Sequence, residues 1–162
     1  MERLWSPWRH EYISQTTTSK SESSACIFCD AQHSTNDEQS LVVHRGTFSF
    51  VILNRYPYIS GHLMIAPYDH LAELDSAPKE TTDELMDLAK RCQTALRNAY
   101  KPEGFNMGMN LGRVAGAGVT DHFHLHIMPR WGGDTNFMTT IGETRVLSED
   151  LNTTYQKLRG KI

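Results

Sequence analysis

The run HFHLHI at residues 122–127 is the feature that most constrains how this 162-residue chain folds. In a β-strand, successive side chains point to opposite faces of the sheet. The run therefore predicts a strand over residues 122–128, with three imidazoles on one face and three apolar side chains in the core. Histidine can act as a nucleophile, a proton carrier or a metal ligand near neutral pH. The row of histidines therefore predicts a functional site, with catalysis favoured over a site that only binds metal.

Other segments predict further strands and one long helix. Apolar, β-rich runs indicate strands over residues 41–43, 48–53, 62–67 and 105–111. Between Pro78 and Pro102, apolar residues recur at helical spacing, which predicts a helix over residues 79–100. A short helix is expected over residues 148–158 and a polar loop over residues 33–40. Strands before and after one long helix in the sequence predict an α+β fold, with the helix on one face of the sheet.

The chain divides into an arm and one domain. Residues 1–25 are predicted to form an N-terminal arm and flexible linker, because Trp5 and Trp8 are followed by a Ser- and Thr-rich stretch over residues 14–25. Residues 26–162 are long enough for a single hydrophobic core. They are therefore predicted to form one domain.

The composition argues against some classes of partner. A net charge of −3 does not suggest extended nucleic-acid binding, which depends on neutralising many phosphates. No stretch approaches the ~20 apolar residues of a membrane span, and the N-terminus lacks the apolar core of a signal peptide. We therefore expect a cytoplasmic protein that binds neither membranes nor extended nucleic acid.

The cysteines predict a metal site. Cys26 and Cys29 stand at the short spacing typical of structural zinc, and disulfides are uncommon in cytosolic proteins. One such pair needs two further ligands, so the alternative is two reduced cysteines without a metal. Cys92 lies in the helical pattern and is expected to be a buried or half-buried free thiol.

Several motifs accompany the histidine row: NRYP at 54–57, SGHLMIAP at 60–67, NLG at 110–112 and AGAGV at 115–119. Over roughly residues 26–131, they resemble the histidine triad (HIT) family of nucleotidyl hydrolases and transferases. The segments RLWSPWR at 3–9 and WGGDTNFM at 131–138 resemble a narrower branch that includes diadenosine polyphosphate phosphorylases. The resemblance implies a HIT-like fold, with a mostly antiparallel five-stranded sheet and one long helix, assembled as a homodimer.

The resemblance also implies roles for individual residues. The nucleophile is placed at His124, with His126 near the phosphate or leaving oxygen and His62 supporting a catalytic imidazole. Asn54 matches a ribose contact and Asn110 a phosphate contact. The predicted catalytic residues are His62, His122, His124 and His126, and the predicted nucleotide-binding residues are Phe28, Phe50, Ile52, Asn54, Asn110, Gly116 and Gly118. Phe28, Phe50 and Ile52 are candidate walls for a purine, although each is individually more typical of a core.

Zinc-bearing members of the family use a histidine after the third strand and the first triad histidine. The resemblance therefore completes the metal site with His70 and His122, giving the ligands Cys26, Cys29, His70 and His122. Four protein ligands close a tetrahedron without an open position, so the zinc is expected to be structural. No acidic cluster lies near the triad, and no magnesium site is expected.

These features predict an enzyme that cleaves the α-phosphate linkage of dinucleoside polyphosphates through a nucleotidyl-histidine intermediate. The acceptor is phosphate or water, and the sequence does not decide between them or reveal the base preference. Residues 112–119 lack the glutamine that many family members place in this loop, so the donor to the leaving group also stays open. The alternatives are a nucleoside phosphoramidate hydrolase and a zinc-stabilised nucleotide-binding regulator with little turnover.

Overall fold

The structure is a computed structural model, and it describes residues 26–142 and 146–162. The predicted arm and linker at residues 1–25, with Trp5 and Trp8, lie outside the described residues. In the described part of the chain, no helix is both long enough and apolar enough to cross a membrane.

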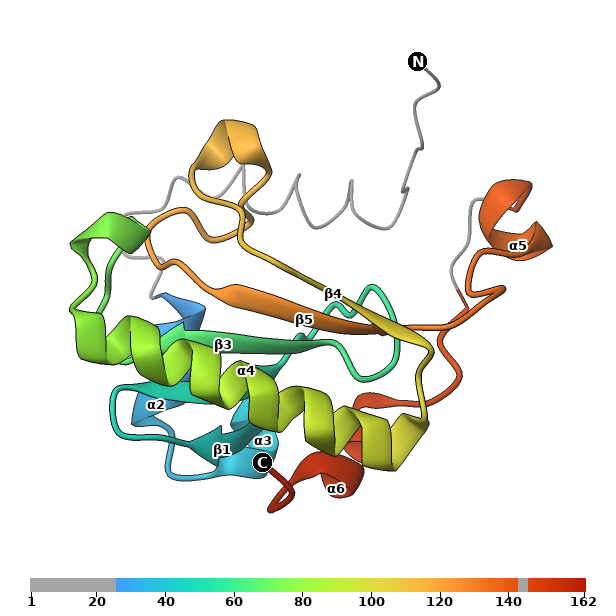
Figure 1. Ribbon diagram of the computed structural model, residues 1–162, viewed down its shortest axis with the longest axis horizontal. Coiled ribbons are helices and arrows are strands. Elements are labelled where there is room, and N and C mark those ends of the chain that lie inside the picture. Colours follow the sequence, from blue (N-terminus) through green and yellow to red (C-terminus); the bar gives the residue numbers. More distant parts are fainter. Residues whose placement is uncertain (1–25, 143–145) are drawn as a thin grey trace.

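A five-stranded antiparallel sheet forms the centre of the domain (Figure 1). Its strands are β1 (Val42–Arg45), β2 (Ser49–Leu53), β3 (Leu63–Pro67), β4 (Gly104–Gly108) and β5 (Leu125–Arg130), in the order β1-β2-β3-β5-β4. All four neighbouring pairs run antiparallel. The predicted α+β class and five-stranded antiparallel sheet are therefore confirmed.

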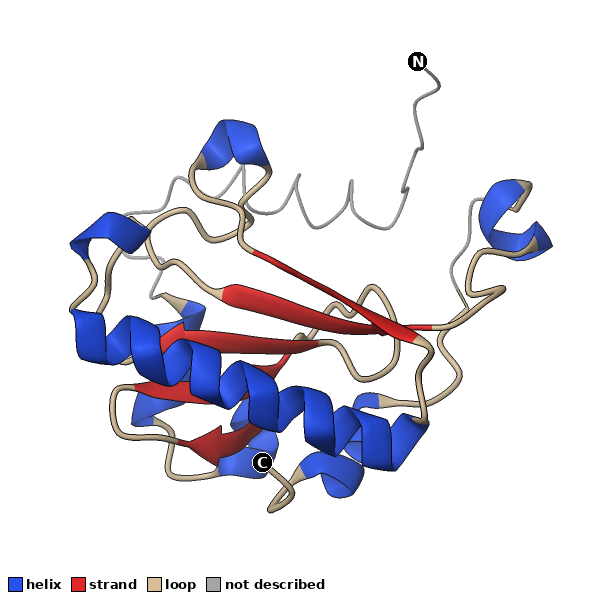
Figure 2. Cartoon of the chain, viewed as in Figure 1, coloured by secondary structure: helices blue, strands red, loops and turns tan. Residues whose placement is uncertain are grey.

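One face of the sheet is covered by the long helix α4 (Lys79–Tyr100), which lies in front of the strands in Figure 2. Its bounds agree with the sequence prediction. Buried side chains of α4, such as Leu88, Cys92 and Leu96, pack with Val51 and Ile127 of the sheet. The short C-terminal helix α6 (Leu151–Leu158) packs beside α4, where Glu149 accepts hydrogen bonds from Tyr100 and Thr154 and pairs with Lys157. This face is the main hydrophobic core.

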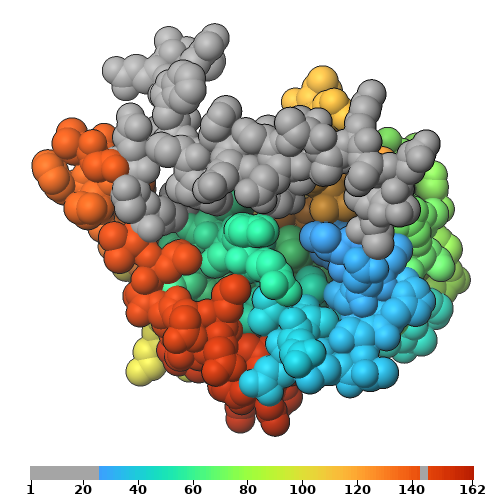
Figure 3. All heavy atoms as spheres, turned by 180° about the vertical axis from the view of Figure 1, so that it is seen from behind, coloured from blue at the N-terminus to red at the C-terminus, as the bar shows by residue number. Residues whose placement is uncertain are grey.

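The opposite face carries the short helix α2 (Ile27–His33), whose atoms are blue in the view from behind in Figure 3, and the short helix α3 (Asp37–Ser40) follows it and leads into β1. Phe28 and Ala31 of α2 pack with Phe50, Ile52 and Met64 in a second cluster. The guanidinium of Arg45 donates to Asp37 and to the carbonyls of Ala31, Gln32 and Ser34, which connects both helices to β1.

The prediction of a loop over residues 33–40 was partly wrong, because residues 37–40 form one helical turn, capped by the Asn36 side chain. This turn has no buried residues, so the sequence shows no apolar pattern that would predict it.

The histidine strand is shorter at its start than predicted. Strand β5 begins at Leu125 rather than residue 122, and Phe123 N–H donates to the Leu71 carbonyl instead of to a strand partner. Strand β3 ends at Pro67, which has no N–H to offer a neighbouring strand. The alternation nevertheless continues through this segment, because Phe123, Leu125 and Ile127 all belong to the α4 core.

Further differences from the sequence prediction concern the end of β4 and the short helices η1, η2 and α5. Strand β4 ends at Gly108 rather than residue 111, because the chain turns there toward the short 3₁₀ helix η2 (Arg113–Ala115). A second 3₁₀ helix, η1 (Leu74–Ser76), precedes α4. The four-residue helix α5 (Phe137–Thr140) follows β5 and projects from the end of the sheet (Figure 1).

Candidate functional site

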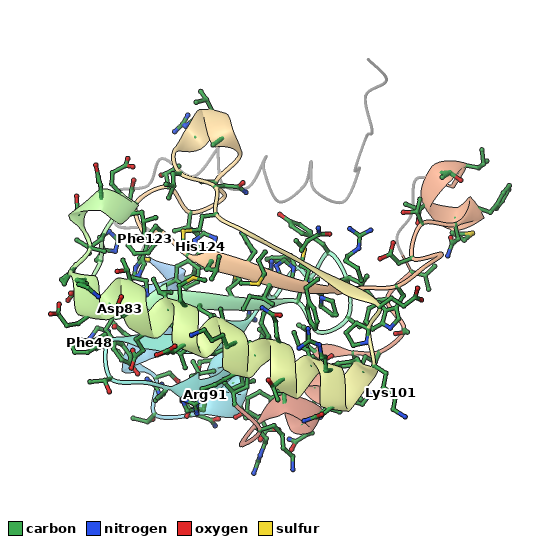
Figure 4. The ribbon with its side chains drawn as sticks, in the orientation of Figure 1. Phe48, Asp83, Arg91, Lys101, Phe123 and His124 are labelled. Atoms are coloured by element: carbon green, nitrogen blue, oxygen red, sulfur yellow. The ribbon has the colours of Figure 1, made fainter. Side chains whose placement is uncertain are left out.

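The three histidines of the row lie on the face of the sheet opposite α4. His122 and His124 are buried, with 0% and 5% of their surfaces exposed, and His126 is half-buried. Figure 4 labels His124 and its neighbour Phe123 where the chain enters β5. The rings of His124 and His126 meet edge to face, with centroids 4.8 Å apart. The predicted sharing of one face is therefore observed, although two of the three histidines precede the strand.

The hydrogen bond of His124 fixes where its ring proton lies. His124 Nδ1 is 3.0 Å from the carbonyl oxygen of His122, and a carbonyl can only accept. Nδ1 must therefore carry the proton, which leaves the lone pair on Nε2. Burial lowers the pKa of His124, so the ring stays neutral near pH 7. A neutral imidazole with an available lone pair has the chemistry of a nucleophile.

His126 contacts a fourth histidine. His62 Nε2 lies 2.9 Å from His126 Nδ1, and the two ring centroids are 5.1 Å apart. His62 is almost completely buried, and burial together with His126 and His124 lowers its pKa to about 3. His62 therefore lies beside the row, where the resemblance implies it, and its lowered pKa favours the neutral imidazole.

The four predicted metal ligands converge. One ligand atom each from Cys26, Cys29, His70 and His122 lies within 4.8 Å of all the others. His122 Nδ1 is 3.4 Å from Cys26 Sγ and 3.8 Å from Cys29 Sγ, and His70 Nδ1 is 3.2 Å from Cys29 Sγ. In a tetrahedral zinc site, with Zn–S ~2.3 Å and Zn–N ~2.0 Å, sulfur and nitrogen ligands lie about 3.5 Å apart. The cluster therefore has the dimensions and donors to hold one tetrahedral ion.

The orientation of His122 also suits a metal. Its Nε2 lies 2.9 Å from the Pro67 carbonyl and must carry the proton, so the lone pair is on Nδ1, which faces the thiols. Burial raises the pKa of the Cys29 thiol, and the adjacent Cys26 raises it further. Both effects disfavour a pair of neighbouring thiolates unless a cation balances their charge.

The glycine-rich segment forms a loop beyond the end of β4. Gly112 and Gly116 bracket η2 with φ angles of +79° and +90°, a region that favours glycine. An added Cβ at either position would meet nothing within 4 Å, so the backbone conformation, not lack of space, requires glycine here. The Asn110 side chain reaches across this loop to the Gly116 carbonyl at 3.5 Å, and Gly118 follows two residues later.

The residues predicted to contact the base are buried, and the residue predicted to contact the ribose is half-buried. Phe28, Phe50 and Ile52 pack in the cluster between α2 and the sheet, and their burial favours the core role. The Phe28 ring contacts the rings of His122 and His124, with centroids 5.1 and 4.7 Å apart. Asn54 Oδ1 accepts the Tyr56 N–H, and Asn54 Nδ2 lies 3.4 Å from His62 Nδ1.

Two contacts of the site were missed by the sequence analysis. The Pro67 carbonyl orients His122, and the Tyr58 N–H donates to His62 Nδ1 at 3.2 Å. Both are main-chain groups. Because every residue type offers a carbonyl and almost every type an N–H, these partners have no signal in the sequence.

Comparison with known proteins places this site in a family. The model of the HIT domain matches residues 35–133. An AP-4-A phosphorylase of Mycobacterium tuberculosis is 38% identical over 163 residues, which cover 98% of this chain and 83% of that protein. The adenosine 5′-monophosphoramidase HNT1 of Saccharomyces cerevisiae is 34% identical over 106 residues, or 65% of this chain and 63% of that protein.

A solved structure shares the fold. The zinc-bound histidine triad family protein of Mycobacterium smegmatis superposes with a TM-score of 0.66 at 24% identity, covering 85% of this chain and 92% of that one. The resemblance found in the sequence is therefore confirmed by a family model, by relatives and by fold. The enzyme prediction is supported by the mycobacterial relative, whose name is that of an enzyme. The chain belongs to the HIT domain family.

Proposed function

We propose that this chain is a nucleotidyl-transferring enzyme that cleaves dinucleoside polyphosphates at the α-phosphorus. The observation that carries the proposal is the hydrogen bond from His124 Nδ1 to the His122 carbonyl, because it leaves the Nε2 lone pair for attack. His124 Nε2 would form a bond to the α-phosphorus while the bond to the bridging oxygen breaks. A nucleotidyl-histidine forms, and the rest of the polyphosphate leaves.

An acceptor then completes the reaction. The phosphorus–nitrogen bond breaks as the acceptor oxygen bonds to phosphorus, which regenerates His124. We propose inorganic phosphate as the acceptor, which gives a nucleoside diphosphate. The support for this substrate and acceptor is the 38% identity to an AP-4-A phosphorylase over nearly the whole chain. Water as acceptor would give a nucleoside monophosphate instead.

The loop at residues 112–118 is proposed to bind the phosphates. Its glycines allow backbone N–H groups to approach an anion closely, and charge that develops on the phosphate oxygens needs such fixed donors. Asn110 spans this loop and is proposed as a phosphate contact, with Gly116 and Gly118 supplying main-chain donors. Asn54 is proposed near the ribose, on the same side as His62.

The Cys26, Cys29, His70 and His122 cluster is proposed to bind zinc. Two thiolates and two imidazoles are a common donor set for structural zinc, and all four coordination positions come from the protein. The ion would join α2 to the segment that carries His124. Because Phe28 of α2 packs on His124, this link bears on the position of the nucleophile.

We also propose that two chains form a homodimer through β4. This strand is the last in the sheet order and pairs with β5 on one side, and within residues 26–142 and 146–162 no strand pairs with its other edge, which could therefore accept a second chain. Met107 on β4 and Met86 on α4 add exposed apolar surface, with 37% and 52% exposed. Light scattering at micromolar concentration should give about twice the 18.4-kDa chain mass. Met107→Glu should produce monomers, whereas Met138→Glu on the projecting α5 should not.

The activity is tested by product analysis. Diadenosine tetraphosphate should give ADP and ATP when inorganic phosphate is present, and the His124→Ala variant should form these products at a severely reduced rate. Oxygen-18 from water should stay out of the ADP. AMP that carries oxygen-18 in place of ADP would show that water is the acceptor. Absence of turnover with and without phosphate would contradict the proposed activity.

A phosphoramidate hydrolase is the second candidate, and it is favoured by the 34% identity to an adenosine 5′-monophosphoramidase. The same nucleophile would attack the α-phosphorus, and an amine would leave. Adenosine 5′-phosphoramidate should therefore be run beside diadenosine tetraphosphate at equal concentration. A kcat/KM that is higher for the phosphoramidate by tenfold or more would favour the second candidate.

A further inference from the structure

The loop between β4 and β5 carries a cation to which the proposed function has so far given no role. Residues 111–121 connect Asn110 to the histidine row, and Arg113 is the single lysine or arginine among them. Arg113 is the first residue of η2 and is exposed. Among residues 26–142 and 146–162, its guanidinium has no hydrogen-bond or ion-pair partner. An exposed and unpaired cation next to a proposed phosphate contact is a candidate for binding a further phosphate.

The pairing of β4 with β5 places the start of this loop beside the nucleophile. Gly108 lies opposite His126 in the antiparallel register. The same register, continued by two residues along each chain, brings Asn110 beside His124. Arg113 follows Asn110 by three residues, so their Cα atoms lie within about 11 Å, because consecutive Cα atoms are about 3.8 Å apart. Arg113 therefore stands close to the centre of the histidine row.

Hydrogen bonds fold the loop into a compact turn. The Gly116 N–H donates to the Arg113 carbonyl at 3.0 Å, and the Ala117 N–H donates to the Gly112 carbonyl at 3.3 Å. The Asn110 side chain closes the turn through the Gly116 carbonyl at 3.5 Å. The backbone of Arg113 is therefore fixed relative to Asn110. A long side chain from this turn can reach a phosphate next to the one that Asn110 is proposed to contact.

Two other arginines near the site have acidic neighbours. Arg130 lies on the histidine face of β5, but its guanidinium makes two hydrogen bonds to Asp134, Nε to Oδ2 at 2.6 Å and Nη2 to Oδ1 at 2.9 Å. Arg55 lines a separate cavity, on whose wall Glu149 also lies. In the described part of the chain, Arg113 has no carboxylate that balances its charge.

We propose that Arg113 is a specificity-determining residue that binds the phosphate next to the α-phosphorus. In the first step this is the β-phosphate of the dinucleoside polyphosphate. In the second step it is the inorganic phosphate that accepts the nucleotidyl group. A guanidinium suits both, because it can form two parallel hydrogen bonds to one phosphate. The inference rests on the proposed function and assigns its choice of acceptor to one side chain.

The order of bond changes explains why one side chain serves both phosphates. His124 Nε2 bonds to the α-phosphorus on one side, while the bond to the β-phosphate oxygen breaks on the other and that oxygen keeps the electron pair. The acceptor enters from the side that the β-phosphate has left. Its oxygen bonds to phosphorus, and the electron pair of the phosphorus–nitrogen bond returns to Nε2. A cation at this position stabilises the leaving oxygen and then holds phosphate in preference to water.

The first test compares products in diadenosine tetraphosphate with a fixed concentration of inorganic phosphate. The ratio of ADP to AMP should fall by about tenfold or more in Arg113→Gln, and by less in Arg113→Lys, which keeps the charge but not the paired hydrogen bonds. Arg91→Gln is the matched control, because Arg91 lies on α4, which covers the other face of the sheet (Figure 4). Its ratio should equal that of the unmodified protein.

Two results of this test would count against the proposal. An unchanged ratio in Arg113→Gln, or an equal fall in Arg91→Gln, would overturn the role of Arg113. AMP as the sole product of the unmodified protein would overturn the assignment of the acceptor.

The second test measures binding without turnover, in the His124→Ala background. Calorimetry compares AMP, which has an α-phosphate alone, with ATP, whose β-phosphate would occupy the proposed position. Arg113→Gln should weaken ATP binding by about tenfold and AMP binding by less than about twofold. Equal losses for the two nucleotides, or no loss for either, would overturn the proposal. Absence of AMP binding even with Arg113 present would contradict the proposed function itself, and this inference with it.

The third test measures the first chemical step alone, as the release of one equivalent of leaving group without inorganic phosphate. Adenosine 5′-phosphoramidate has no β-phosphate and loses an amine, so Arg113 has no anion to bind. The release rate in Arg113→Gln should fall by roughly 10- to 100-fold for diadenosine tetraphosphate and by less than about twofold for the phosphoramidate. Parallel losses for both substrates would show that Arg113 supports the fold of the loop, and would overturn the proposal.

Discussion

His122, the first histidine of the row, lies against two cysteine thiols, whereas His126, the last histidine, contacts another histidine. His122 faces Cys26 and Cys29 through Nδ1, whereas His126 faces His62 through Nδ1. The difference lies in the partners and not in the residue type or the face of the sheet. Between the two ends, His124 is the residue whose hydrogen bond leaves Nε2 with a lone pair. The three roles therefore come from the surroundings of identical side chains.

Main-chain groups create this difference. The Pro67 carbonyl accepts a hydrogen bond from His122 Nε2, and the His122 carbonyl accepts one from His124 Nδ1. The Tyr58 N–H donates to His62, which contacts His126. Each contact fixes one ring nitrogen and so determines what the other can do. The comparison can be broken by variants that should affect one end of the row and not the other.

The largest effect is expected at the centre of the row. His124→Ala should lower kcat by roughly 10⁴-fold or more, because it removes the group that forms the covalent bond. Nucleotide affinity, measured by calorimetry, should change little. Phe28 loses a ring contact in this variant, so a melting curve should accompany the kinetics. Turnover close to that of the unmodified protein would mean that His124 is not the nucleophile.

The next largest effect is expected at the sulfur end. Metal analysis of the purified protein should give about one zinc per chain, and Cys29→Ser should lose it. Loss of the ion should lower the free energy of unfolding by several kcal/mol, since metal binding stabilises only the folded chain. Activity should fall at the same time, because α2 and Phe28 pack against the nucleophile.

The third thiol supplies the control for this experiment. Cys92 is buried in α4 on the other face of the sheet, as the sequence predicted. Cys92→Ala should lower stability through lost packing while zinc content stays at one per chain. Equal zinc content in the Cys29→Ser and Cys92→Ala variants would contradict the proposed zinc site at Cys29.

A smaller effect is expected at the phosphate loop, outside both ends of the row. Asn110→Ala should lower kcat and raise KM, each by roughly tenfold, because a phosphate contact serves the bound substrate and the transition state. The zinc content should be unchanged. A loss confined to stability would assign Asn110 to supporting the loop through the Gly116 carbonyl.

The sequence predicts the two ends of the row unequally. The Cys26 and Cys29 spacing, together with His70 and His122 placed by the family motif, predicts all four residues of the observed cysteine and histidine cluster. The strands and α4 follow from apolar periodicity, because burial of a face leaves a repeating pattern. The start of β5 at Leu125 could not be predicted, because it depends on Pro67 in the neighbouring strand. The direction of the His62–His126 hydrogen bond could not be predicted either, because a main-chain N–H decides it.

The smallest effect is a pH dependence of stability that belongs to the His126 end. His62 has an ordinary pKa near 6.5 in the unfolded chain and about 3 in the folded one. Above pH 6.5 the ring is neutral in both states and contributes nothing to the pH dependence. As the pH falls below 6.5, the unfolded chain takes up a proton that the folded chain refuses, so stability falls until about pH 3.

The size of this effect can be isolated by comparison with His62→Gln, which cannot take up a proton. At about 1.4 kcal/mol per pH unit, the wild-type protein should lose about 2 kcal/mol between pH 7 and pH 5 that the variant does not lose. Urea unfolding of both proteins at the two pH values measures this difference. The thiols and the other histidines are present in both proteins, so their contributions cancel when the two pH-dependent losses are subtracted. Equal losses in the two proteins would mean that the folded chain accepts a proton on His62, and a cationic His62 has no lone pair to accept the Tyr58 N–H. The hydrogen bond from Tyr58 to His62 would then be lost, and the two ends of the row would no longer differ in the way described above.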